Sequence, residues 1–114
     1  MTFIKRFSRC LRSGILLTAA VSSGAYALDD QQQSALRHLL LQDCGSCHGM
    51  TLKGGLGPAL LPERMREMGL ENIKAVIKYG RPGTAMPPWQ ALLQDDEIDY
   101  LSQTLLQGIQ HEQH

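Results

Sequence analysis

The pentapeptide Cys44-Gly45-Ser46-Cys47-His48 limits the possible structures of this chain more than any other feature. The pattern C-x-x-C-H is the attachment signature of a c-type haem. Two thiols at this spacing can each add across a haem vinyl group, and the imidazole of His48 then lies under the iron as the proximal ligand. Gly45 and Ser46 are small, so the porphyrin can approach the backbone closely. The motif therefore predicts one covalent haem c.

Three other interpretations of the cysteine pair explain less of the sequence. A structural disulfide suits an oxidising compartment but leaves the adjacent His48 without a role. A thioredoxin-like redox pair needs a strand–helix–strand context, which this sequence does not show. A zinc site needs four ligands, and the chain has no second cysteine pair. We therefore expect haem attachment through Cys44 and Cys47.

The first 27 residues have the three-part pattern of a secretory signal peptide. Four basic side chains come first, an apolar run follows at 15–21, and Ala25-Tyr26-Ala27 offers a cleavage site of the A-x-A type. A short membrane anchor is the alternative, but the run is shorter than the roughly 18 residues that a bilayer crossing needs. We expect export to the periplasm, cleavage after residue 27 and no stable membrane insertion afterwards. Residues 28–114 then form the mature domain, without Cys10.

The charge balance differs between these two segments. Residues 28–114 carry seven basic and eleven acidic side chains, a net charge of −4. This excludes a basic nucleic-acid binder, and it predicts basic patches on partners unless the charge is only a solvated surface. A mature chain of 87 residues with few aromatic side chains buries little core by itself. We expect the haem to supply much of that core.

Helical spacing of apolar residues predicts an all-α fold of three to four helices around the haem. A first helix is expected from a cap at Asp29 or Asp30 to about Cys44, ending at Gly45. Glycine- and proline-rich loops are expected at 48–62 and 81–90. Between and after them we expect a short helical turn at 63–68, a helix at 71–79 with Ile73, Val76 and Ile77 inward, and a last helix from about Asp95 to Gly108 with Ile98, Leu101 and Leu105 inward.

A low-spin electron carrier needs a second axial ligand, and Met86 is the best placed side chain. It lies in a loop 38 residues after His48, far enough to reach the opposite haem face. Pro87 biases Met86 toward extended backbone, and Pro88 stiffens the next position of the loop. Methionine ligation raises the reduction potential compared with two imidazoles. The other methionines and histidines have simpler explanations. Met65 and Met68 suit core packing, and Met50 lies too close to His48 to reach the opposite haem face. His38 suits a helix surface, and His111 and His114 suit a chain end.

The segments Cys44–His48, Gly57–Leu60 and Gly83–Trp89 resemble class I c-type cytochromes. The resemblance implies that the first and last helices cross and that the haem sits in a cleft. It also implies that the Pro58 carbonyl accepts the His48 Nδ1 proton. Trp89 is similar to the aromatic residue that commonly follows the ligating methionine, although plain core packing also explains it.

Two longer segments, Leu41–Leu61 and Gly80–Trp89, are similar to the small monohaem cytochrome encoded beside cytochrome cd1 nitrite reductase in denitrifying bacteria. That resemblance implies a role in passing electrons to the nitrite reductase. Its alternative is a redox factor in making or loading the d1 haem of that reductase. A two-ligand iron site on a small acidic domain predicts a one-electron carrier and not an enzyme, and a monomer is the natural default for such a shuttle. A small haem enzyme such as a peroxidase needs an open iron position, against which Met86 and its prolines argue.

Overall fold

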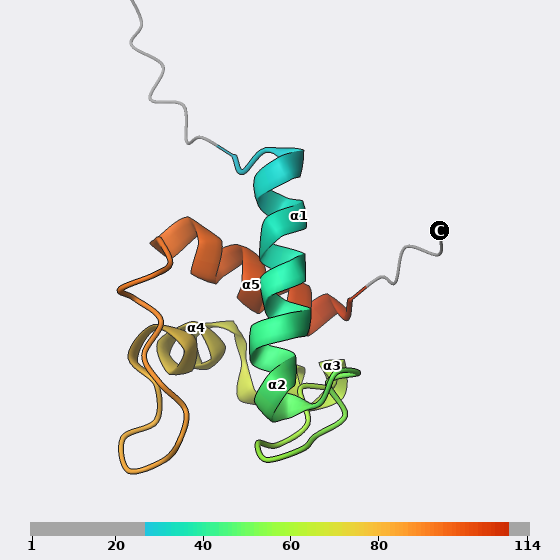
Figure 1. The fold of residues 1–114 in the computed structure, drawn as a ribbon, viewed down its shortest axis with the longest axis vertical. Coiled ribbons are helices and arrows are strands. Elements are labelled where there is room, and N and C mark those ends of the chain that lie inside the picture. Colours follow the sequence, from blue (N-terminus) through green and yellow to red (C-terminus); the bar gives the residue numbers. More distant parts are fainter. Residues whose placement is uncertain (1–26, 110–114) are drawn as a thin grey trace, which may run out of the picture.

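The computed structural model describes residues 27–109, and every regular element in that range is a helix (Figure 1). The elements are α1 (Asp30–Leu39), η1 (Leu40–Cys44), α2 (Gly45–His48), α3 (Pro62–Met68), α4 (Leu70–Tyr79) and α5 (Asp95–Gln107). The predicted all-α fold is thereby confirmed. The signal peptide predicted at 1–27 lies outside the described residues except for Ala27, as do His111 and His114.

The first helix begins where its cap was expected. The Gln32 backbone N–H donates to Asp29 Oδ1 at 2.8 Å, and the Asp29 N–H donates to Gln32 Oε1 at 2.9 Å. This reciprocal pair satisfies two backbone donors at the start of α1. Asp29 is therefore the cap, one of the two candidates that the sequence offered.

The end of this helix was predicted wrongly at Gly45. That residue has ordinary helical backbone angles (φ −60°, ψ −27°), and the helix continues through α2 to His48. The stop is Gly49, whose φ of 91° favours glycine. A Cβ on Gly49 would also lie 2.5 Å from the Gly54 carbonyl oxygen. The stretch from Leu40 to Cys44 is a single turn of π-helix. It holds one residue more than an α-helical turn and ends at the first cysteine of the pair.

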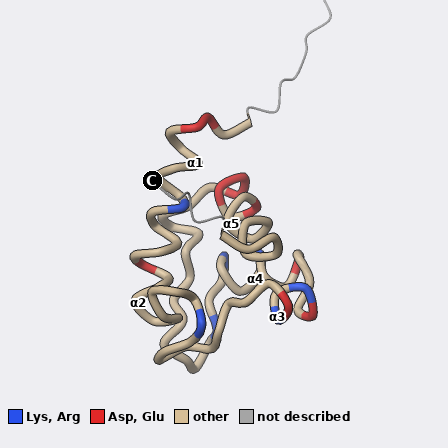
Figure 2. The backbone as a smooth tube through the Cα atoms, turned by 90° about the vertical axis from the view of Figure 1, so that its right-hand side faces the viewer, with Lys and Arg blue, Asp and Glu red and all other residues tan. Residues whose placement is uncertain are grey.

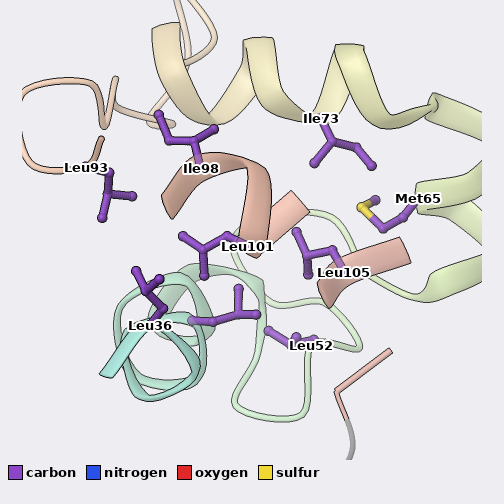
Figure 3. Close-up of a cluster of buried hydrophobic side chains, with 9 residues drawn as sticks. Leu36, Leu52, Met65, Ile73, Leu93, Ile98, Leu101 and Leu105 are labelled. Atoms are coloured by element: carbon purple, nitrogen blue, oxygen red, sulfur yellow. The ribbon is translucent and has the colours of Figure 1, made fainter. Parts of the chain in front are cut away.

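Helix α5 lies at the centre of the fold and contacts α1, α3 and α4. The side chains predicted to face inward from α5 are buried, as is Ile73 of α4, whereas Val76 and Ile77 are half-buried (Figure 3). Met65 fills the same core, which is the role expected for it. The full set of buried apolar side chains is Leu36, Leu40, Leu52, Met65, Ile73, Leu93, Ile98, Leu101 and Leu105.

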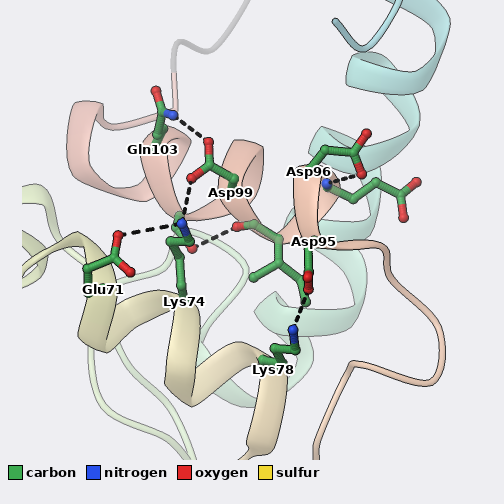
Figure 4. Close-up of polar contacts among 10 residues, drawn as sticks. Glu71, Lys74, Lys78, Asp95, Asp96, Asp99 and Gln103 are labelled. Atoms are coloured by element: carbon green, nitrogen blue, oxygen red, sulfur yellow. Dashed lines mark hydrogen bonds and ion pairs between the residues drawn. The ribbon is translucent and has the colours of Figure 1, made fainter. Parts of the chain in front are cut away.

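Two lysines on α4 tie that helix to α5 (Figure 4). Lys74 Nζ lies 3.0 Å from Asp99 Oδ1, and Lys78 Nζ lies 2.6 Å from Asp95 Oδ1. The hydrogen bond from Lys74 holds the pKa of Asp99 below its ordinary value. The same bonds to Asp99 and Asp95 raise the pKa values of Lys74 and Lys78. The Lys78 pair lies in the last turn of α4, the end from which the loop to Met86 departs, and the Lys74 pair joins the middle of α4 to α5.

Acidic side chains gather where α1 and α5 begin (Figure 2). Asp30 lies in the first turn of α1, and Asp95, Asp96 and Glu97 lie in the first turn of α5. Carboxylates at these positions interact favourably with the positive ends of the helix dipoles. Within residues 27–109, no helix has the length and apolar content that crossing a bilayer requires.

Candidate functional site

The cysteine pair and His48 lie at the carboxyl end of the long first helix. Cys44 closes the π turn, and Cys47 and His48 belong to α2. Both thiols are free, Cys44 half-buried against the core and Cys47 exposed. Burial raises the pKa of the Cys44 thiol to about 11, and the Asp43 carboxylate adds to this shift. The Cys44 thiol is therefore protonated at neutral pH, and its apolar setting suits an uncharged thioether.

His48 is oriented by one hydrogen bond. Its Nδ1 lies 2.7 Å from the Pro58 carbonyl oxygen, the contact that the resemblance implied. Because a carbonyl oxygen only accepts, the ring must carry its proton on Nδ1. This tautomer leaves Nε2 as the neutral nitrogen that can bind a metal.

The loop after α2 is held against the end of the helix by its glycines. The Gly57 N–H donates to the Cys47 carbonyl oxygen at 2.7 Å, and the Gly54 N–H donates to the His48 carbonyl oxygen at 2.8 Å. These bonds satisfy two carbonyl groups that the helix end leaves free. A Cβ on Gly57 would lie 2.8 Å from Cε1 of His48. Only glycine at 57 therefore lets the loop approach the imidazole so closely.

Met86 lies on a second loop, which leaves and returns to the carboxyl end of α4. The Trp89 N–H donates to the Ile77 carbonyl oxygen at 3.0 Å, and the Arg81 N–H donates to the Met86 carbonyl oxygen at 3.1 Å. A Cβ on Gly80 would lie 2.6 Å from that same oxygen. Met86 is half-buried, and the half-buried Trp89 packs against the core.

The two loops project from the same end of the helical body, away from the start of α1 (Figure 1). One carries Pro58 and cradles His48, and the other carries Met86. Met50 is exposed in the first loop, two residues after His48, and His38 is exposed on α1. An imidazole at a helix end and a thioether on a separate loop are donor types that a haem iron takes as its two protein ligands.

The residues present fit a covalent haem better than a bare metal ion. Two free thiols, one imidazole nitrogen and one thioether are the donor set of a methionine-ligated haem c. No three His, Cys, Asp or Glu side chains within the described part of the chain are grouped as a metal ion would require. The zinc interpretation therefore has no site in residues 27–109.

A pocket of about 200 Å³ lies elsewhere, between the first loop and the end of α5. Its walls are largely apolar and include Leu52, Leu60 and Leu105, but none of the four predicted attachment and ligand residues. We therefore assign the site from the arrangement of donors and not from this pocket.

Two positions that shape the site were not predicted from the sequence. Gly80 allows the close approach of the chain to Met86, and the Thr84 hydroxyl bonds within the Met86 loop. A threonine two residues before the methionine is a signal for such a local bond, because Ser and Thr hydroxyls readily bond nearby backbone groups.

Comparison with known proteins identifies the family. The model for cytochrome c oxidase, cbb3-type, subunit III matches residues 31–103. Cytochrome c55X of Pseudomonas aeruginosa is 54% identical over 80 residues, which cover 70% of this chain and 67% of that protein. Cytochrome c55X of Stutzerimonas stutzeri is 45% identical over 105 residues, which cover 92% and 90%.

A solved structure agrees with these matches. The c-type cytochrome NirC aligns with a TM-score of 0.68 and 52% identity, over 70% of this chain and 94% of that one. Proteins of this family bind haem c covalently, so haem c is the cofactor of this chain. The chain therefore belongs to the c-type cytochromes, among the small members that include cytochrome c55X.

Proposed function

We propose that this chain is a periplasmic one-electron carrier that donates electrons to a nitrite reductase of the cytochrome cd1 type. The observation that carries the proposal is the oriented imidazole of His48 together with a separately tethered Met86. Two axial ligands leave the iron no open position for a substrate. Such an iron passes electrons and does not bind the molecule that is transformed.

Each site residue has a part in this proposal. Haem c, when bound, supplies the change between Fe²⁺ and Fe³⁺. Cys44 and Cys47 would hold it through thioether bonds, and His48 and Met86 would bind its iron. The Pro58 carbonyl keeps Nε2 of His48 available and raises the basicity of the ring through the 2.7 Å bond at Nδ1.

Hydrogen bonds from the two loops would keep both ligands in place. The first is bonded to the end of α2 and the second to the end of α4. A side chain on an already ordered loop would lose little conformational freedom on binding the iron. The free-energy cost of forming a site with both ligands bound is therefore smaller. Trp89 packs against the core and so anchors the end of the second loop.

The nitrite reductase role follows from the resemblance of Leu41–Leu61 and Gly80–Trp89, and export follows from the pattern of residues 1–27. We test it with the purified holo-protein, reduced and then mixed with purified cytochrome cd1 nitrite reductase and nitrite. The ferrous haem absorption should disappear far faster than with nitrite alone. Oxidation at the rate seen with nitrite alone would count against the donor role.

A gene deletion in the host separates the two roles that the resemblance offers. If the reductase from the deletion strain contains its full d1 haem while nitrite reduction in cells is slowed, the chain supplies electrons. If the reductase lacks d1 haem and the wild-type gene restores it, the chain acts in d1-haem maturation instead. Expressing the Met86→Ala variant in the deletion strain shows whether the lost function requires the second iron ligand.

A further inference from the structure

The loop that carries Met86 contains a smaller closed turn, residues 81–86. The Arg81 N–H donates to the Met86 carbonyl oxygen at 3.1 Å, which joins the two ends of this turn. The Thr84 N–H donates to the Arg81 carbonyl oxygen, also at 3.1 Å. The backbone of Met86 is therefore tied to the residue that follows Gly80.

The Thr84 hydroxyl makes two further bonds inside this turn. It donates to the Arg81 carbonyl oxygen at 2.7 Å and accepts from the Met86 N–H at 3.3 Å. It thus links the first residue of the turn to the last. A side-chain hydroxyl in this position acts as a brace, because each bond restricts where the other end can move.

The chemistry of the neighbouring residues makes this brace important. Pro87 and Pro88 have no backbone N–H. From Met86 to Pro88 the only backbone donor is therefore the Met86 N–H, and Thr84 accepts it. Without the hydroxyl, the backbone at Met86 keeps only the bond at its carbonyl oxygen.

We propose that Thr84 is the positioning residue of the Met86 ligand, and that its hydroxyl holds the thioether at the haem iron. This inference rests on the proposed site, in which Met86 is the second axial ligand. When the hydroxyl is absent, the turn opens more often and the sulfur leaves the iron more often. The iron is then accessible to small ligands for a larger fraction of the time.

Thr84→Val tests the proposal, because valine keeps the branched shape of threonine and removes the hydroxyl. Thr84→Ser keeps the hydroxyl and loses only the methyl group. Thr104→Val is the matched control, since Thr104 belongs to α5 and to neither loop, and its Oγ1 donates to the Tyr100 carbonyl oxygen at 2.8 Å. All three variants are prepared as holo-proteins, and their helix content is compared by circular dichroism.

The readouts are the reduction potential, the rate of cyanide binding to the ferric protein and the long-wavelength absorption band of a sulfur-bound ferric haem. In Thr84→Val we expect a weaker band, a lower potential and cyanide binding that is about tenfold faster, as for the loss of one or two ordinary hydrogen bonds. Thr84→Ser and Thr104→Val should match the wild type. A Thr84→Val protein with wild-type band and cyanide rate would overturn the proposal, and so would a Thr84→Ser protein that behaves like valine.

Met86→Ala separates failure of this inference from failure of the site itself. If Met86→Ala keeps the band, Met86 is not the ligand and the proposed site is wrong. If Met86→Ala loses the band while Thr84→Val keeps it with unchanged cyanide binding, the site stands and only the role of Thr84 is refuted. Should Thr84→Val attach no haem, the serine variant still decides, because the proposal requires its cyanide rate to equal that of the wild type.

Discussion

Replacing Gly57 with alanine is expected to disturb the proximal ligand directly. The new Cβ would lie 2.8 Å from Cε1 and 2.9 Å from Nδ1 of His48. Carbon atoms in contact prefer a separation of about 3.5–4.0 Å, so at least one side must move by roughly 0.7 Å. The ring cannot retreat freely, because Nδ1 is bonded to the Pro58 carbonyl oxygen at 2.7 Å.

Either response to Gly57→Ala weakens a hydrogen bond. If the loop withdraws, the bond from the Gly57 N–H to the Cys47 carbonyl oxygen lengthens from 2.7 Å. If the ring tilts, its bond to Pro58 lengthens instead. Overpacking of this kind costs about 1–3 kcal/mol of stability. A weaker Nδ1 bond also makes His48 a poorer donor to Fe³⁺, so the potential should rise by about 20–60 mV, equivalent to about 0.5–1.5 kcal/mol.

The assay compares Gly57→Ala with Gly69→Ala. Gly69 has a φ of 83° and no atom within 4 Å of an added Cβ, and it lies between α3 and α4. Alanine there should cost about 1–3 kcal/mol through backbone strain alone, because only glycine readily adopts φ 83° with ψ 150°. Denaturant unfolding should show a loss of stability in both holo-proteins, whereas only Gly57→Ala should change the potential. Equal potentials in the two variants would refute the reasoning about the His48 contact.

Three further predictions concern the ligands and the helix pair. Met86→Ala should leave haem attached but lower the potential and admit cyanide, checked by electrochemistry and by absorption spectra; a wild-type potential would show that another group is the ligand. His48→Ala should abolish haem attachment or folding, checked by haem staining after denaturing electrophoresis; normal staining with a stable fold would contradict it. The pKa of Asp99 lies below its ordinary 3.8 because Lys74 donates to it. Its stabilising effect is therefore complete above about pH 4 and is lost as the pH falls through the folded-state pKa. Asp99→Asn should therefore reduce the fall in melting temperature on acidification below about pH 4. An unchanged fall would exclude the Lys74–Asp99 pair as a contributor to the pH dependence of stability.

Much of the fold could be predicted because apolar periodicity reports burial directly. Ile98, Leu101 and Leu105 recur at helical spacing, and all three are buried on α5. The end of the first helix could not be predicted in the same way. A glycine either ends a helix or continues it, and its backbone angle decides which, as Gly45 and Gly49 show.

Some features of the candidate site could likewise be predicted from the sequence, and others could not. The attachment residues and Met86 are predicted from residue chemistry and spacing alone, and they stay predictions. The brace at Thr84 and the clearance at Gly57 depend on which backbone atoms a loop brings close. Those distances come from the three-dimensional path of the chain, and glycine or threonine alone does not specify them.

The π turn from Leu40 to Cys44 has a consequence for how this chain can vary. A turn with i→i+5 bonds holds one residue more than an α-helical turn. Leu36, before the turn, and Leu40, its first residue, are both buried, which fixes the rotation of α1. Removing one residue from this turn would leave an ordinary α-helical turn, so Cys47 and His48 would face nearly the same direction as before. The π turn is therefore the one place in this helix where the loss of a residue is tolerable, whereas a deletion within the regular turns of α1 would rotate the attachment motif by about 100°.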